Sequence, residues 1–110
     1  MKKILVVDND QLILKFMNDI LTKEGHQVIT AEDCLSALDI LKSYTPDVIF
    51  TDLVMPNIGG KKLCEIIRGT EELKDTFLII LSAVAAEEEA DIAEMSADAC
   101  IAKGPLNEMT

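Results

Sequence analysis

No apolar run in the sequence is long enough to cross a membrane. The longest runs are residues 4–7, 48–50 and 77–81, whereas a membrane-spanning helix needs about 20 apolar residues. The N-terminal run is also too short for a secretory signal, because Asp8-Asn9-Asp10 interrupts it. We therefore expect a cytoplasmic protein without a membrane partner, in which the first apolar run is a β-strand.

Basic residues are scarce as well. The chain has 10 Lys and Arg against 20 Asp and Glu, which gives a net charge of −10. Proteins that bind the phosphate backbone of nucleic acids need a basic patch. The charge balance therefore argues against direct binding of nucleic acid.

Cysteines are few and far apart in the sequence, at Cys34, Cys64 and Cys100. Their odd number and the lack of any Cys-x-x-Cys or Cys/His cluster argue against a disulfide framework and a structural zinc site. Each cysteine stands beside apolar residues, and this setting predicts three buried thiols.

What the sequence does contain is a regular alternation of short apolar runs and amphipathic segments. Apolar runs predict strands at residues 3–7, 27–31, 47–51, 76–81 and 99–102. Between them, helices are predicted after the capping residues Asp10 and Asp33, after Gly59-Gly60, and at residues 86–95. Strands that are apolar on both faces and alternate with helices are typical of a parallel sheet covered on both sides. We therefore expect an α/β, doubly wound fold in a single domain of residues 1–110.

Two details of these helices can be predicted. The apolar stripe of the first helix comprises Ile13, Phe16, Met17, Ile20 and Leu21, and Gly25 ends this helix. A fifth helix is expected to begin at Pro105, and the chain ends before this helix would be complete.

Polar residues stand at the ends of four of the predicted strands. Asp8 and Asn9 follow the first, Asp52 the third, Ser82 the fourth and Lys103 the fifth. Ligands of open parallel sheets bind beyond the carboxyl ends of the strands, where the strand order reverses. If the order is 2-1-3-4-5, Asp8, Asn9 and Asp52 converge there, and Ser82 and Lys103 lie on the adjoining side. Two carboxylates, an amide, a hydroxyl and an ammonium group together suggest a hard cation with a phosphoryl group.

These residues lie in segments that resemble a known family. Residues 4–10 (ILVVDND) and 47–60 (DVIFTDLVMPNIGG) resemble the first strand and the phosphoacceptor strand and loop of response-regulator receiver domains. Residues 79–83 (IILSA) and 97–103 (ADACIAK) resemble the last two strands of that family. The resemblance covers nearly the whole chain at family spacing. It implies a flavodoxin-like sheet of five parallel strands in the order 2-1-3-4-5.

The resemblance also implies a role for each matched residue. Asp52 would accept a phosphoryl group from the phosphohistidine of a sensor histidine kinase or phosphotransfer protein. The Mg²⁺ ligands would be Asp8, Asn9, Asp52 and the backbone carbonyl of Val54. Ser82 and Lys103 would bind the phosphoryl group. Such a domain is not a classical enzyme, because it promotes only its own phosphorylation and dephosphorylation. It would control an output domain or a partner protein. The resemblance is also compatible with a dimer.

Three positions depart from the family pattern. Asn9 stands where the family usually has a second acid, which predicts weaker binding of Mg²⁺. Cys100 stands where the family usually has an aromatic residue, whose side chain signals the change between the inactive and the phosphorylated form of the domain. Gly104 separates Lys103 from Pro105, so the Lys–Pro peptide bond of the family cannot form here.

Two other interpretations remain. One is a receiver-like module that binds proteins without ever being phosphorylated, for which Asn9 and Cys100 are the support. The other is a phosphatase similar to haloacid dehalogenases, with Asp8 as nucleophile and Asp10 as general acid. The chain is short for that fold, and Asp52 would have no role in it.

Overall fold

The computed structural model describes residues 1–52, 59–82 and 97–102. Its strands are β1 (Lys3–Val7), β2 (Gln27–Ala31), β3 (Val48–Asp52), β4 (Phe77–Ser82) and β5 (Ala99–Ala102). They form one parallel sheet in the order β2-β1-β3-β4-β5. The predicted flavodoxin-like order is therefore confirmed.

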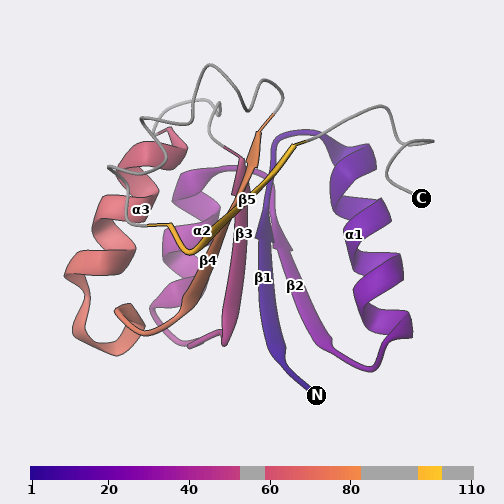
Figure 1. Ribbon diagram of the computed structural model, residues 1–110, viewed down its shortest axis with the longest axis horizontal. Coiled ribbons are helices and arrows are strands. Elements are labelled where there is room, and N and C mark those ends of the chain that lie inside the picture. The colour runs from indigo at the N-terminus through magenta and orange to yellow at the C-terminus, as the bar shows by residue number, and fades with distance from the viewer. Residues whose placement is uncertain (53–58, 83–96, 103–110) are drawn as a thin grey trace.

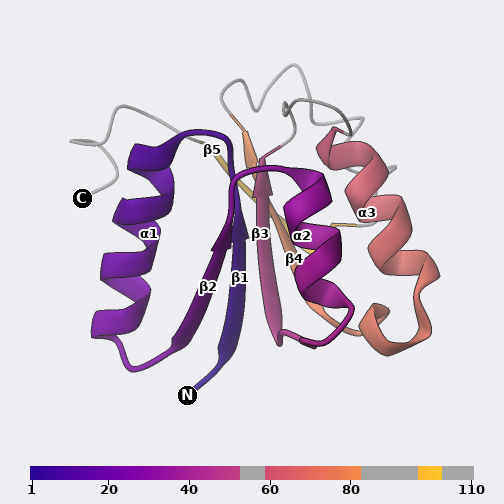
Figure 2. The ribbon, with the colours of Figure 1, turned by 180° about the vertical axis from the view of Figure 1, so that it is seen from behind.

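Helices cover the two faces of this sheet. The described helices are α1 (Gln11–Lys23), α2 (Cys34–Leu41), α3 (Gly60–Gly69) and the short 3-10 helix η1 (Glu71–Leu73). Helix α1 lies on one face, and α2 and α3 lie together on the other (Figures 1 and 2). The doubly wound α/β fold is thereby confirmed. The helices predicted at residues 86–95 and from Pro105 onward lie outside the described residues. None of the helices that are described has the length and apolar character needed to span a bilayer.

The hydrophobic core has two layers, because alternate residues of each strand face opposite sides of the sheet. In β1, Leu5 and Val7 belong to the layer beneath α2 and α3, whereas Ile4 and Val6 belong to the layer beneath α1. Residues 4–7 are all buried. The strand thus packs on both faces, as its uninterrupted apolar sequence predicts.

The predicted helix ends are confirmed by local hydrogen bonds. The side chain of Asp10 accepts a hydrogen bond from the Leu12 N–H, and that of Asp33 accepts one from the Ser36 N–H. Each carboxylate thereby satisfies a backbone donor that has no partner within its helix. Gly25 follows α1 with φ of 90°, a left-handed conformation that glycine adopts without steric cost.

The face of α1 that packs on the sheet differs from the predicted stripe. Ile13 and Met17 are buried as expected, but Leu14 is buried too, whereas Ile20 is 41% exposed. Helix α1 lies mainly against β2 and β1, at one side of the sheet. This placement turns Leu14 inward and leaves Ile20 at the rim of the contact. The prediction for Ile20 was therefore wrong.

The cysteine prediction is confirmed at two positions and wrong at the third. Cys34 and Cys64 are buried between the sheet and helices α2 and α3, but Cys100 is exposed. Cys100 lies in β5, which is the edge strand of the described sheet and pairs with β4 alone. An edge strand has fewer neighbours to cover its side chains, and local sequence does not reveal this position.

This difference predicts how the three thiols react. Burial raises the pKa of the Cys34 and Cys64 thiols to about 11, and only a thiolate is an effective nucleophile. We therefore expect Ellman's reagent to modify Cys100 alone in the native protein and all three cysteines after denaturation. Cys100→Ser should abolish the native reaction. Rapid native reaction of that variant would contradict the prediction.

A second prediction concerns Asp98, the residue before β5. Its carboxylate accepts hydrogen bonds from the Leu78 N–H and from Arg68, and these hold the pKa of Asp98 below its ordinary value. The stabilisation is therefore present above the unfolded pKa of about 3.9 and is lost as the pH falls through the lower folded pKa. In Asp98→Asn, the free energy of unfolding should fall less steeply below pH of about 4. Urea unfolding at a series of pH values checks this, and parallel curves for the two proteins would refute it.

Candidate functional site

Asp8 and Asp52 lie side by side at the carboxyl edge of the sheet. Val7 of β1 pairs with Thr51 of β3, so the next residue on each strand is one of the two aspartates. Paired strands are about 4.8 Å apart. Asp8 is fully buried and Asp52 is 6% exposed. The sheet thus brings together the carboxylates of Asp8 and Asp52, as the sequence predicts.

These two strands flank the point where the strand order reverses. β1 is followed by α1 on one face of the sheet, whereas β3 is followed along the chain by α3 on the other face (Figure 1). The helices α1 and α3 that come after these two strands therefore lie on opposite faces of the sheet. Open α/β sheets bind their ligands at such a reversal, beyond the strand ends.

Local hydrogen bonds fix the backbone around Asp8. Its N–H donates to the Ala31 carbonyl (3.1 Å), and its Oδ1 accepts from the Asp10 N–H (2.9 Å). The Asp10 Oδ1 in turn accepts from the Leu12 N–H (2.9 Å) at the start of α1. Asp10 is therefore engaged as a helix cap, and Asn9 lies exposed between the two acids.

Sequence reasoning missed a polar neighbour of Asp52. Thr51 is fully buried, and its Oγ1 donates to the Asp52 carbonyl at 3.1 Å. A buried hydroxyl is costly without a partner, and this bond supplies one. The only signal in the sequence was a polar residue within an apolar strand.

Of the remaining predicted site residues, the structure describes only the backbone of Ser82. Ser82 is the last residue of β4 and pairs with Ala102, the last residue of β5. β4 lies beside β3, with Leu81 opposite Asp52. The backbone of Ser82 therefore reaches the same edge as Asp52. The Ser82 side chain, Val54 and Lys103 lie outside the described residues.

The chemistry of the described donors fits a hard divalent cation. Two carboxylates held side by side and away from water repel each other, and a cation between them offsets this repulsion. The described residues contain no cluster of three or more His, Cys, Asp and Glu side chains. A cation at this edge would thus need an amide oxygen, a backbone carbonyl or water to complete its ligands. Asn9 and the Val54 carbonyl are the predicted donors of this kind.

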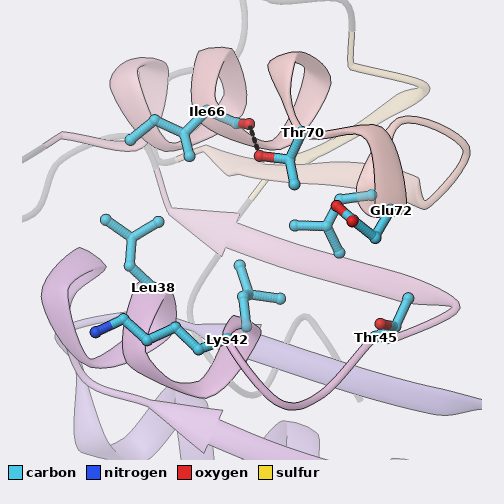
Figure 3. A pocket seen from close by; sticks show the side chains of 8 residues that line it. Leu38, Lys42, Thr45, Ile66, Thr70 and Glu72 are labelled. Atoms are coloured by element: carbon cyan, nitrogen blue, oxygen red, sulfur yellow. Dashed lines mark hydrogen bonds between the residues drawn. The ribbon is translucent and has the colours of Figure 1, made fainter.

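A groove lies near the opposite edge of the sheet. This groove of about 490 Å³ runs between the end of α2 and the segment from α3 to η1, and both of these segments lead into the amino ends of strands. Figure 3 shows Leu38 and Lys42 on one side of the groove and Ile66 and Thr70 on the other. The groove is separate from the carboxylate pair and contributes nothing to the candidate site.

Similar proteins share both the sequence pattern and the fold. PilG of Pseudomonas aeruginosa is 35% identical over 80 residues, which are 73% of this chain and 59% of PilG. The chain therefore covers less than two thirds of that relative. The crystal structure of the response regulator TrrA from Thermotoga maritima, in complex with Mg²⁺ and BeF, superposes with a TM-score of 0.85 at 32% identity. The superposition covers 99% of this chain and 93% of TrrA.

Two further findings agree with these similarities. CheY4, a chemotaxis response regulator of Vibrio cholerae, superposes with a TM-score of 0.90 at 25% identity, over 99% of this chain and 96% of CheY4. The sequence pattern that defines the response regulator receiver domain matches residues 4–109. This match favours the receiver interpretation over the phosphatase alternative. The chain therefore belongs to the response regulator receiver domain family, whose members are signalling domains of two-component systems.

Proposed function

We propose that this domain is switched by transfer of a phosphoryl group to Asp52. The observation that carries the proposal is the pair of buried carboxylates, Asp8 and Asp52, on adjacent strands at the reversal of strand order. Asp52 lies at the end of β3, beyond which a ligand can approach from the carboxyl edge of the sheet. The described residues thus supply a nucleophile and a neighbouring acid in one place.

The transfer step conserves atoms and charge. An oxygen of the Asp52 carboxylate attacks phosphorus and forms a new oxygen–phosphorus bond. The phosphorus–nitrogen bond of the donor phosphohistidine breaks, its electron pair leaves with the imidazole, and the imidazole nitrogen takes up a proton from water. The product is an acyl phosphate on Asp52.

Asp8 and Asn9, with the Asp52 carboxylate and the Val54 carbonyl, would hold Mg²⁺. TrrA, the relative that is 32% identical, was crystallised with Mg²⁺ and BeF. When bound, the cation offsets the negative charge of the incoming phosphoryl group. Asp8 is well suited to this role, because the bond from the Asp10 N–H to Asp8 Oδ1 fixes its orientation.

Ser82 and Lys103 would contact the phosphoryl group from the β4 and β5 side of the site. A hydroxyl donates one hydrogen bond, and an ammonium group adds positive charge next to the phosphoryl oxygens. If Ser82 and Lys103 move when the domain is phosphorylated, the surface that an output domain or partner protein binds would change. In this proposal the chain is a single receiver domain. The donor of its phosphoryl group is a sensor histidine kinase or a phosphotransfer protein.

Incubation with acetyl phosphate and Mg²⁺ tests the proposal. Intact-mass spectrometry should show the addition of one phosphoryl group, and chelation of Mg²⁺ by EDTA should prevent it. A fully folded protein that takes no label from acetyl phosphate or phosphoramidate would favour the alternative, a receiver-like module that binds partners without being phosphorylated.

A further inference from the structure

The two central residues of the edge strand β5 bury little surface that could define its alignment with β4. Its residues are Ala99, Cys100, Ile101 and Ala102. Cys100 is exposed and Ile101 is 44% exposed. The register of a strand is specified strongly only where its side chains bury one face in the core. The side chains of Cys100 and Ile101 therefore do little to specify the register of β5.

Polar contacts immediately before β5 supply the missing constraint. The Asp98 N–H donates to the Leu78 carbonyl (2.8 Å), and the Asp98 Oδ2 accepts from the Leu78 N–H (2.8 Å). Both backbone polar groups of Leu78 are thus bound by one residue. The pairing that follows starts with Ala99 opposite Ile79. A chain shifted by one residue would lose both bonds to Leu78.

Arg68 of α3 holds Asp98 in this position. Its Nη2 donates to the Asp98 Oδ2 at 2.7 Å, and its Nη1 donates to the carbonyls of Lys74 (3.0 Å) and Thr76 (2.8 Å). The guanidinium group therefore joins the end of α3, the segment before β4 and the residue before β5. The Arg68 side chain is only 20% exposed. The planar, forked guanidinium makes these bonds together, which the single ammonium of lysine does with less directional control.

We propose that Arg68 and Asp98 are positioning residues, which set the register of β5 and thereby deliver Lys103 to the phosphoryl site. The proposal rests on the function proposed above. Lys103 follows Ala102, the residue that pairs with Ser82 at the carboxyl edge. A slip of one residue displaces a strand by about 3.3 Å and turns each side chain to the opposite face. Such a slip would remove the Lys103 ammonium from its proposed contact.

The first experiment measures the register itself by NMR. The wild type should show nuclear Overhauser contacts between the backbones of the paired residues Ile79 and Ala99, and of Leu81 and Ile101. These contacts should be lost or shifted in Asp98→Ala and Arg68→Ala. Asp98→Asn retains an oxygen acceptor for the Leu78 N–H and should restore them. Glu71→Ala serves as the matched control, because it removes a nearby 2.7 Å ion pair with Lys74 that does not touch β5. An unchanged register in both alanine variants would overturn the proposal.

The second experiment connects register to phosphorylation by acetyl phosphate. Asp98→Ala should slow labelling by the same factor as Lys103→Ala, and the double variant should be no slower than either single one. Residues that act through one contact have non-additive effects. Equal slowing by Asp98→Ala in the wild-type and Lys103→Ala backgrounds would mean general destabilisation and would overturn the proposal. If the wild type takes no label, the proposed function fails, whereas the NMR contacts still decide whether Arg68 and Asp98 set the register.

Discussion

Asp52→Asn is expected to abolish phosphoryl uptake from acetyl phosphate. The substitution preserves the size of a side chain that is 6% exposed, but an amide is not a nucleophile toward phosphorus. It also relieves the repulsion between the neighbouring carboxylates of Asp8 and Asp52, so the fold should persist. Intact-mass spectrometry after incubation with Mg²⁺ and donor measures the uptake, and urea unfolding confirms that the variant is folded.

Asp39→Asn is the control for this experiment. Asp39 is an exposed acid that pairs with Lys42 at 3.7 Å, near the end of α2 that leads to the amino end of β3. It should take up label as the wild type does. Full labelling of Asp52→Asn would show that another residue is the acceptor, and peptide mapping of the labelled protein would then identify that residue.

Asn9→Asp is expected to tighten Mg²⁺ binding about five- to thirtyfold, which is roughly 1–2 kcal/mol. Hard cations bind through oxygen, and their affinity rises with the charge of the ligands. Asn9 offers a neutral carbonyl oxygen where the family usually has a carboxylate. Because Asn9 is exposed, solvent screens part of the added charge and keeps the gain below that of a buried pair. Isothermal titration of the wild type and the variant with Mg²⁺ measures the difference.

The competing source of a second carboxylate is Asp10, and a matched variant separates the two. The Asp10 Oδ1 caps α1 through the Leu12 N–H at 2.9 Å, and asparagine caps a helix about as well as aspartate. Asp10→Asn should therefore preserve both the helix and the Mg²⁺ affinity. If Asp10→Asn weakens binding strongly while Asn9→Asp changes nothing, Asp10 is the metal ligand and the role proposed for Asn9 is wrong.

The features that sequence alone determined are those set by short-range physics. Asp10 and Asp33 are helix caps because each carboxylate satisfies a backbone donor two or three residues ahead. The apolar strands, and the acids Asp8 directly after β1 and Asp52 at the end of β3, follow from alternation and spacing along the chain. The strand order was implied by the family resemblance, and the pairing of β1 with both β2 and β3 confirms it.

Tertiary structure decided the features that depend on which elements become neighbours. Leu14 rather than Ile20 is buried because α1 lies at one side of the sheet, and Cys100 is exposed because β5 is an edge strand. Arg68 and Asp98 are 30 residues apart, and no sequence pattern links them. In the sequence, Arg68 is simply a basic residue in the last turn of a helix, a favourable place for positive charge in any helix. Its bond to Asp98 exists only because the sheet places β4 and β5 side by side, and contacts of this range depend on the packing of the whole domain.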